Sequence, residues 1–517
     1  MVGAGTYAQK WEQTIGQPNQ NEHSRKVTEH YDKGYLISAQ VEESGWLLKT
    51  DINGNVLWDK EIGTYPGVVI TTKTVYDNSG NIYLFGLIWG DLNQDYPAVI
   101  KLNACGELQW CRLFYFEEYD FGVFYDGILL DNGDLLGVAN MPNEGQHDMI
   151  FLFCISPDGE YKWKKSYASC DNYPNFEMRL GSRIQFFDDI YIISGYTYAP
   201  HPNFPNTTSI RPMFIGIDTL FNEKWVLVFG MEDNMKGKAL TSIPINDSLF
   251  MGVGRYRYVD STGMTMDAWA MFYNDKGQQT GYKRITRDKL GPEVRESTFY
   301  EIERIDDSKY LATSGYIYGE DGDAMGEIVF DTAGNVYNYT IREDANSLPS
   351  IVKTFDNKYM IASSHLNPNL TWDILLYKIN QNLEHDTLYP GNYTYDSLCP
   401  HPIESGVIDL TGCDVVTSIE EIPTLEQYRR QQQSITITAS PNPAGSAEVV
   451  FALENTGAFS NIQLHISDAY GNQIHTQSIL PGQGAIAVDI ATWPPGIYIA
   501  VVYSDGSARC KAKFVVR

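Results

Sequence analysis

The stretch VTEHYDKGYLISAQVEESGWLLKTDINGNVLWDKEIG, residues 27–63, reads as four short β-strands joined by turns. The first strand ends in the turn D-K-G, the second is YLISA, the third is WLLKT, and VLWDKEIG follows the turn DINGN. Apolar and aromatic runs of this length, bounded by Gly, Asn and Asp, are typical of antiparallel hairpins. We therefore expect a four-stranded sheet here.

The same four-part pattern recurs along the first 390 residues. Its second run returns as YLFGL, DLLGV, YIISG, LFMGV, YLATSG and YMIASS, which begin at residues 83, 134, 191, 249, 310 and 359. A turn signal such as DNSGN or DNK precedes nearly every copy. Seven units result. Four short strands cannot bury one face of their sheet alone, so neighbouring units must pack sheet on sheet. A closed ring leaves no long open edge, which favours a seven-bladed β-propeller over a linear solenoid.

A second sequence similarity indicates how the two ends of the ring meet. KWEQTIG at 10–16 resembles the fourth strand LWDKEIG at 57–63, yet no first three strands precede it. The seventh unit, residues 351–391, has three good strands and lacks the Gly and aromatic residue that mark the fourth. We therefore expect the N-terminal strand 10–16 to close the last blade of a propeller that spans residues 1–395.

Charge and hydropathy narrow the class of protein. The net charge is −27, and residues 434–517 hold 5 acids and 4 bases, so the first 433 residues carry −26. Such a surface repels nucleic acid and anionic lipid. No apolar run is long enough for a transmembrane helix. The start MVGAGTYAQKW has neither the basic nor the apolar region of a signal peptide, so we expect the native signal peptide to be absent from this sequence.

Seven cysteines give no metal-binding spacing. Cys399 and Cys413 bracket a 15-residue segment that one disulfide could close, and we expect that bond in an oxidising compartment. The other five are expected to be small buried apolar residues, with room for one more bridge: Cys105, Cys111, Cys154, Cys170 and Cys510.

The last 84 residues differ from the rest. After a polar linker at 396–433, residues 434–517 alternate apolar and polar positions in about seven short runs separated by Gly, Pro and Asn. This pattern predicts a small, near-neutral, immunoglobulin-like β-sandwich.

Four segments of this sandwich resemble the type A sorting domain of the type IX secretion system. They are SPNP at 440–443, SDAYGN at 467–472, PPGIYIAVV at 494–502 and KAKFVV at 511–516. The residues that carry the resemblance are Pro441, Asn442, Pro443, Gly471, Gly496, Tyr498, Lys511 and Lys513. The resemblance implies export across the outer membrane by the type IX machinery, to the cell surface or the medium. An immunoglobulin-like sandwich with no sorting role is the alternative.

The repeats also resemble known propellers. Their GYLI…WLLKTDINGNVLW pattern is similar to that of secreted propellers of Bacteroidetes, which implies fold and compartment more than activity. Asp51, Gly54 and Trp58 resemble the tryptophan-docking repeat of quinoproteins, and SPDGEYKW at 156–163 resembles the sialidase Asp-box. Both depart from those patterns in spacing, and a turn with a Trp packed between blades fits the same residues. No cofactor follows.

Aromatic residues gather in the predicted loops between the second and third strands of three units. In propellers these loops share one face of the ring and commonly bind ligands. The candidate ligand-binding residues are Trp89, Tyr96, Tyr196, Tyr198, His201, Phe204, Arg255, Tyr256, Arg257 and Tyr258. Exposed aromatics beside polar groups suit a sugar ring or a peptide. Alternating YTY and RYRY equally fit strand ends with one face buried.

No linear motif indicates catalysis. The nine histidines form no HxH or HExxH pair, a G-x-S-x-G elbow is absent, and EDGDAMG at 320–326 lacks the spacing of a calcium loop. We therefore favour a non-catalytic, surface or secreted propeller that binds a glycan or a protein. The alternatives are a propeller hydrolase or lyase, whose carboxylates would come from separate blades, and a structural surface or motility component.

Overall fold

The fold is described from a computed structural model. The structure describes residues 10–63, 69–89, 95–116, 122–143, 146–168, 178–201, 204–231, 236–260, 263–285, 289–291, 293–319, 322–416, 435–445, 447–454, 456, 459, 461–469, 472–504 and 507–517. The chain divides into two compact units, Met1–Glu420 and Glu421–Arg517. No helix among the described residues is long and apolar enough to cross a membrane.

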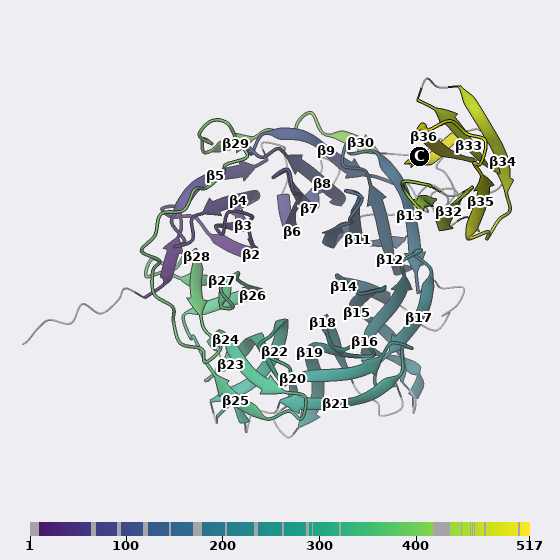
Figure 1. The fold of residues 1–517 in the computed structure, drawn as a ribbon. Helices are drawn as coiled ribbons and strands as arrows, with labels where there is room; N and C mark the ends of the chain where they lie inside the picture. Colours follow the sequence, from purple (N-terminus) through teal and green to yellow (C-terminus); the bar gives the residue numbers. More distant parts are fainter. Residues whose placement is uncertain are drawn as a thin grey trace, which may run out of the picture. The chain divides into compact units, whose positions relative to one another are not determined.

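The first unit consists of antiparallel sheets arranged around a ring (Figure 1), and the described residues form seven of them. The innermost strands are β2 (Glu22–Glu29), β6 (Val69–Tyr76), β10 (Val123–Leu129), β14 (Met178–Phe187), β18 (Lys236–Asn246), β22 (Val294–Arg304) and β26 (Ala345–Lys353). Each innermost strand contacts the innermost strands of both neighbouring sheets, and β26 contacts β2, so the ring is closed. The propeller fold expected from the repeats is therefore present.

The other strands follow outward in chain order. The second strands are β3 (Tyr35–Val41), β7 (Ile82–Trp89), β11 (Leu135–Asn143), β15 (Ile190–His201), β19 (Leu249–Asp260), β23 (Lys309–Tyr318) and β27 (Tyr359–Leu366). The third strands are β4 (Ser44–Thr50), β8 (Asp95–Leu102), β12 (Gln146–Ile155), β16 (Phe204–Asp218), β20 (Gly263–Asn274), β24 (Gly322–Asp331) and β28 (Trp372–Ile379). The outer strands are β5 (Val56–Ile62), β9 (Leu108–Phe114), β13 (Tyr161–Tyr167), β17 (Glu223–Val228), β21 (Gln279–Ile285), β25 (Val336–Tyr339) and β1 (Glu12–Ile15).

The chain's first strand completes its last sheet, as the repeat of KWEQTIG predicted. β1 pairs antiparallel with β28, with Glu12 opposite Tyr377 and Ile15 opposite Ile374. Trp11, just before β1, is fully buried in an apolar cluster that draws residues from the last sheet and the first. The core of the ring thus lies between neighbouring sheets, and its closure depends on the two chain ends meeting.

Tryptophans of the outer strands dock on the turns of the next sheet. The Trp11 indole N–H donates to the carbonyl oxygen of Ile52, in the turn between the third and fourth strands of the first sheet, at 2.9 Å. The same indole-to-turn bond recurs twice around the ring, from Trp110 to Pro157 at 3.1 Å and from Trp225 to Asp275 at 2.8 Å. The tryptophan of one sheet therefore packs on the turn of the next sheet. This packing explains why a turn followed by a tryptophan, as in DINGN-VLW, recurs in the sequence.

The turns themselves are fixed by their first residue. One Asp51 carboxylate oxygen accepts the backbone N–H groups of Asn53 at 2.8 Å and Asn55 at 2.9 Å. The Asn55 side chain donates to the other oxygen at 2.8 Å. Such Asx turns explain why Asp or Asn begins so many of these five-residue segments.

A strap follows the last sheet and returns to the first two. Within the predicted linker, β29 (Gly406–Ile408) pairs in parallel with β5, and β30 (Asp414–Val416) pairs in parallel with β9. We call residues 389–416 the strap. The Trp58 indole donates to Asp396 at 3.0 Å. The Asn53 side-chain amide donates to the Tyr389 carbonyl oxygen at 3.0 Å, and its oxygen accepts the Tyr389 N–H at 2.7 Å. These contacts attach the strap to the ring.

The predicted Cys399–Cys413 disulfide is wrong. Cys399 is bonded to Cys105 and Cys413 to Cys111, across sequence separations of 294 and 302 residues. The strap runs along the outside of the second sheet, so each of its cysteines meets a cysteine of β9 or of the turn before it, not the other strap cysteine. Cys154 and Cys510 form no disulfide among the described residues, and Cys170 lies outside them.

The second unit has two sheets around one apolar cluster. One holds β31 (Thr436–Ser440), β32 (Glu448–Glu454) and β35 (Ala485–Asp489). The other holds β33 (Ile462–Asp468), β34 (Gln473–Ile479), β36 (Gly496–Ser504) and β37 (Ser507–Val516). Phe451 and Phe514, one from each sheet, pack edge to face with centroids 5.3 Å apart. Two sheets over a shared core match the predicted sandwich layout.

The predicted sorting residues meet at the last strand. The Asn442 side-chain amide, between Pro441 and Pro443, donates to the carbonyl oxygen of Lys513 at 3.0 Å, and its oxygen accepts the Val515 N–H at 3.1 Å. Gly496 begins β36, and Tyr498 in the same strand is buried against Phe514. Lys511 and Lys513 are exposed on β37, and Gly471 lies outside the described residues.

Candidate functional site

A β-bulge interrupts every inner strand of the ring at the corresponding place. The register shifts fall between Ser24/Lys26, Thr71/Lys73, Phe124/Asp126, Gly181/Arg183, Ala239/Thr241, Phe299/Glu301 and Asn346/Ser350. A bulge turns the following side chain away from the direction that strict alternation would give it. The residue after each shift is polar or charged, and we call these seven residues the channel ring: Lys26, Lys73, Asp126, Arg183, Thr241, Glu301 and Ser350.

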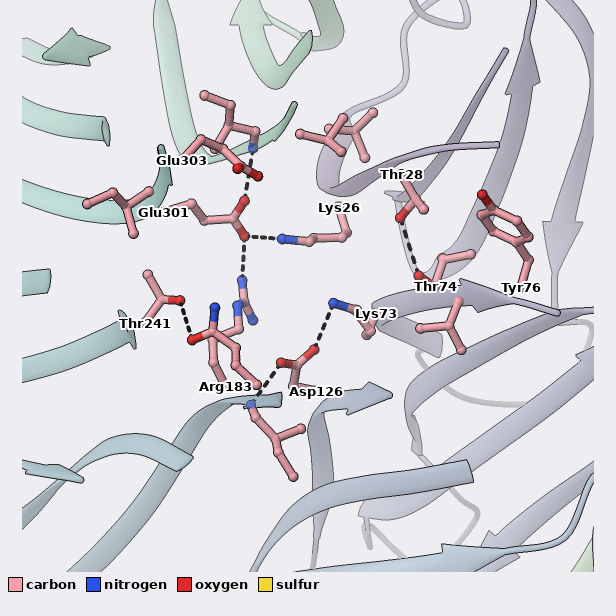
Figure 2. A pocket seen from close by; sticks show the side chains of 17 residues that line it. Lys26, Thr28, Lys73, Thr74, Tyr76, Asp126, Arg183, Thr241, Glu301 and Glu303 are labelled. Atoms are coloured by element: carbon pink, nitrogen blue, oxygen red, sulfur yellow. Dashed lines mark hydrogen bonds and ion pairs between the residues drawn. The ribbon is translucent and has the colours of Figure 1, made fainter. Parts of the chain in front are cut away.

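Six of the seven channel-ring residues line a cavity of about 390 Å³ on the axis of the propeller, and the seventh, Ser350, donates to Glu301. All residues that line this cavity belong to the innermost strands of the seven sheets. Figure 2 shows charged side chains from opposite sides of the cavity pointing toward one another. Each sheet thus contributes to one shared polar site, and no single unit contains it.

Glu301 is the most heavily bonded group of the cavity. Its carboxylate accepts from the ammonium of Lys26 and from the Arg183 guanidinium at 2.9 Å, and also from the Ile351 N–H at 2.9 Å and the Ser350 hydroxyl at 3.1 Å. Burial opposes ionisation, but these partners outweigh it and lower the pKa of Glu301 to about 2. Glu301 is therefore an ionised hub that joins three sheets to its own.

Asp126 forms a second pair on the other side of the cavity. Its side chain is almost fully buried, and one oxygen lies 3.3 Å from the Lys73 ammonium. The other oxygen accepts the Ile184 N–H at 3.0 Å. Both channel-ring carboxylates are thus paired with cations from other inner strands, Asp126 with one from the adjacent sheet and Glu301 with two from across the cavity.

Two other groups of the cavity have pKa values near neutrality. Burial raises the pKa of Glu303 to about 7, and the charge of Glu301 adds to this. Burial lowers the pKa of Lys26 to about 8, and Arg183 and Lys73 add to that effect, although Glu301 opposes it. Glu303 can therefore hold or release a proton near physiological pH, which is the property of a general acid or base.

The ten residues predicted to bind ligand come from other strands, and none of the seven whose side chains are described lines this cavity. They belong to β7 (Trp89), β8 (Tyr96), β15 (Tyr196, Tyr198, His201), β16 (Phe204) and β19 (Arg255, Tyr256, Arg257, Tyr258). By the strand register, Tyr198 lies opposite Met178 at the start of β14, whereas the cavity is lined by Arg183 and Gln185 further along β14. The predicted residues therefore lie toward the end of the sheets where the inner strands begin.

The segments predicted as loops are largely hairpins. β15 and β16 remain paired out to Pro200 and Thr208, and β19 and β20 out to Asp260 and Gly263. The alternating YTY and RYRY sequences are therefore in strands, as the alternative interpretation held. Trp89 is 44% exposed, and Tyr96, Tyr196, Tyr198, Arg255, Tyr256 and Arg257 are half-buried. The side chains of His201, Phe204 and Tyr258 lie outside the described part of the chain, and the ligand-binding role of all ten stays a prediction.

One buried cluster has the residue types of a metal site. Ligand atoms of His30, Asp32 and Asp396 lie within 4.8 Å of one another. The Lys49 ammonium, however, binds Asp32 at 2.5 Å, and the backbone N–H of Asp396 donates to Asp32 at 3.0 Å. These partners hold the pKa of Asp32 far below its usual range despite its burial. A cation is already in place, and the cluster joins the strap to the first sheet.

Sequence reasoning missed the channel ring, although the sequence contains a signal for it. Its residues recur every 47 to 60 positions, each within the first run of its unit and a few residues before the turn. A polar residue in the middle of an inner strand is unremarkable by itself. Aligning the seven units on their turns would have placed all seven in one column.

Comparison with known proteins identifies the tail. Residues 439–517 match the family described as "Secretion system C-terminal sorting domain". The tail indicates export by the type IX secretion system to the cell surface or the extracellular space. No curated protein matches the chain.

Several solved structures are similar to the chain at low identity. A protein of unknown function from Dyadobacter fermentans has a TM-score of 0.41 at 9% identity, over 73% of this chain and 99% of its own. Drosophila Semaphorin 2a has a TM-score of 0.40 at 9% identity, over 99% and 100%. A catalytically inactive virginiamycin B lyase from Staphylococcus aureus has a TM-score of 0.39 at 12% identity, over 71% and 98%. Similarities of this size carry no information on activity.

Proposed function

Because residues 439–517 match the secretion-system sorting family, we propose that the ring they accompany is an exported, non-catalytic module that binds a glycan or a protein. The observation that carries the proposal is the state of the central carboxylates. Glu301 has two cationic partners and Asp126 has one. A glycoside hydrolase needs one carboxylate free to act as nucleophile or base beside a protonated acid. Here both channel-ring carboxylates are occupied in holding sheets together.

The ion-paired, partly buried cations of the cavity are suited to binding a polar ligand. Lys26, Lys73 and Arg183 line the cavity and keep part of their side chains exposed. Polar groups fixed in advance by ion pairs recognise a polar ligand with little loss of conformational entropy. Few aromatic side chains line the cavity, since Tyr76 is its one aromatic residue among those described.

A single observation favours an enzyme as the second candidate. Glu303 lies two residues from Glu301 on β22, and the pKa values of the two carboxyls differ, at about 7 and about 2. Alternate residues of a strand lie on the same face. Carboxyls whose pKa values are driven apart by their surroundings are the usual sign of an acid and a base. In that case Glu303 would be the proton donor.

A paired binding and turnover screen separates the two functions. The purified full chain is applied to a glycan array, and each bound glycan is then incubated with the protein and analysed by mass spectrometry. The binding module is supported if ligands are retained unchanged. Turnover that disappears in Glu303→Gln but persists in Glu160→Gln, an exposed turn residue, would replace it with the enzyme.

A further inference from the structure

Four cations face one another across the hairpin of β18 and β19. Lys238 is paired with Arg255, and Lys236 with Arg257. Directly opposite residues of an antiparallel pair lie on the same face, and residues two apart on one strand share that face. We call these four residues the cationic hairpin. Its side chains are all half-buried.

This arrangement opposes folding. Like charges directly opposite each other destabilise a sheet. Burial, with the charges of Arg255 and Arg257, lowers the pKa of Lys238 to about 8. Among the described residues, no carboxylate lies within 4.0 Å of the charged groups of Lys238 or Arg255, although ion pairs are frequent elsewhere in the ring. Within the hairpin, Lys238 and Arg255 therefore carry charges that no carboxylate in the described part of the chain pairs.

Glu296 of the next inner strand is the neighbouring acid. It is close enough for Arg255 and Arg257 to favour its ionised form, but burial outweighs them and its pKa is raised. Glu296 is therefore not a stabilised counter-charge for Arg255. This contrasts with Glu301 and Asp126, which pair with every cation of the channel ring.

An aromatic ring of the adjacent sheet holds Lys238 in place. The Lys238 ammonium lies 3.8 Å from the ring centroid of Tyr196, which comes from β15 of the adjacent sheet. A cation–π contact positions an ammonium without cancelling its charge. Lys238 is therefore held in position while its positive charge remains.

We propose that the cationic hairpin binds one oxyanion group, a carboxylate, phosphate or sulfate, on a small ligand or at the end of a glycan. This inference deepens the proposed binding function and rests on it. We expect one anionic group and not an extended polyanion, because the first 433 residues carry a net charge of −26 and would repel a long negatively charged chain. Arginine and lysine together are the donors best suited to an oxyanion.

The test measures anion binding by calorimetry on the full chain, at low and constant ionic strength. The probes are inorganic phosphate, inorganic sulfate and glucuronate, with glucose as the neutral control, so the three arms distinguish the sources of the oxyanion. Lys238→Met and Arg255→Gln remove one cation each. Lys276→Met is the matched control, because Lys276 is an exposed residue in the turn between β20 and β21 of the same sheet.

We expect at least one anionic probe to bind the wild type and Lys276→Met equally, and Lys238→Met and Arg255→Gln about 10- to 100-fold more weakly. We also expect the thermal midpoint of Lys238→Met without anion to equal or exceed that of the wild type, because repulsion is relieved. A lowered midpoint together with unchanged anion affinity would overturn the inference and leave Lys238 a structural residue.

Two further results separate this inference from the proposed function. If the wild type binds a glycan on the array but none of the three anions, the inference fails and the binding module stands. If anions bind and the array shows turnover, the anion site stands and the non-catalytic function fails.

Discussion

Trp11 donates its indole N–H to the carbonyl oxygen of Ile52 across the seam where the first strand of the chain completes the last sheet. The two residues belong to different sheets, so this bond helps to close the ring. Replacing Trp11 by Ala is expected to cost about 3–5 kcal/mol of unfolding free energy, because it empties a fully buried site and leaves a carbonyl unpaired. Urea denaturation measures the loss. Trp89→Ala, at an exposed position, should change it by less than about 0.5 kcal/mol. Equal effects would contradict the role of Trp11 in closure.

The two disulfides can be checked directly. Proteolysis without reduction is expected to release one peptide pair joined through Cys105 and Cys399 and another through Cys111 and Cys413. Replacing both cysteines of one bridge by Ala should lower the unfolding free energy by about 2–5 kcal/mol. Cys510→Ala, which removes a free thiol of the second unit, is the control. A peptide that links Cys399 to Cys413 would restore the bridge expected from sequence.

Glu301 is predicted to stabilise the ring through its two cations. Glu301→Gln leaves Lys26 and Arg183 half-buried without their counter-charge, and breaking such a pair costs about 3–5 kcal/mol. Adding Lys26→Met to this variant should recover part of the loss, since one unpaired cation is then removed. Chemical denaturation of the single and double variants measures both effects. A double variant less stable than Glu301→Gln would show that Lys26 stabilises the ring independently of this pair.

Glu303 should make stability depend on pH in the opposite sense to a paired carboxylate. Its folded pKa of about 7 lies above its usual value of 4.5, so the folded state binds the proton more tightly than the unfolded state. Its contribution is complete below about pH 4.5 and is lost as the pH rises through 7. Relative to Glu303→Gln, the wild type should therefore lose about 1–3 kcal/mol between pH 4.5 and pH 8. Urea midpoints at both pH values measure this difference, and parallel changes in the two proteins would contradict the raised pKa.

Removal of residues 434–517 should abolish export, because this segment contains the matched sorting domain. The shortened chain is expected to accumulate in the periplasm of a host with a working type IX system and a supplied signal peptide. Fractionation and immunodetection compare it with the full chain. Export of the shortened chain at the same level would show that the ring carries its own signal.

Much of the fold was predictable from the sequence, for a physical reason. Asx turns and outer-strand tryptophans are local devices that recur in several sheets, so Asp51 and Trp58 revealed the repeat, and Trp11 revealed the closing strand. The sorting segments were recognisable because a short domain needs its turns and last strand in fixed order. These features depend on residues close in sequence.

The candidate sites depend on distant residues, and sequence reasoning found them poorly. The cysteine pairing failed because proximity in sequence favoured a short loop, whereas the strap carries Cys399 and Cys413 past β9. The channel ring requires bulges, and strict alternation does not show a one-residue shift. The cationic hairpin requires the register of two strands, which places Lys238 opposite a residue 17 positions later in the chain.

The strap also determines how the molecule responds to mechanical tension. β30 is the last strand before the chain leaves the ring. It is hydrogen-bonded to β9, and Cys413, which is bonded to Cys111, comes immediately before it. A pull on the C-terminus therefore loads the hydrogen bonds between β30 and β9 and then, one residue upstream, a covalent cross-link to the same strand. The force enters the ring at β9, away from the hydrogen bonds between β1 and β28 that close it.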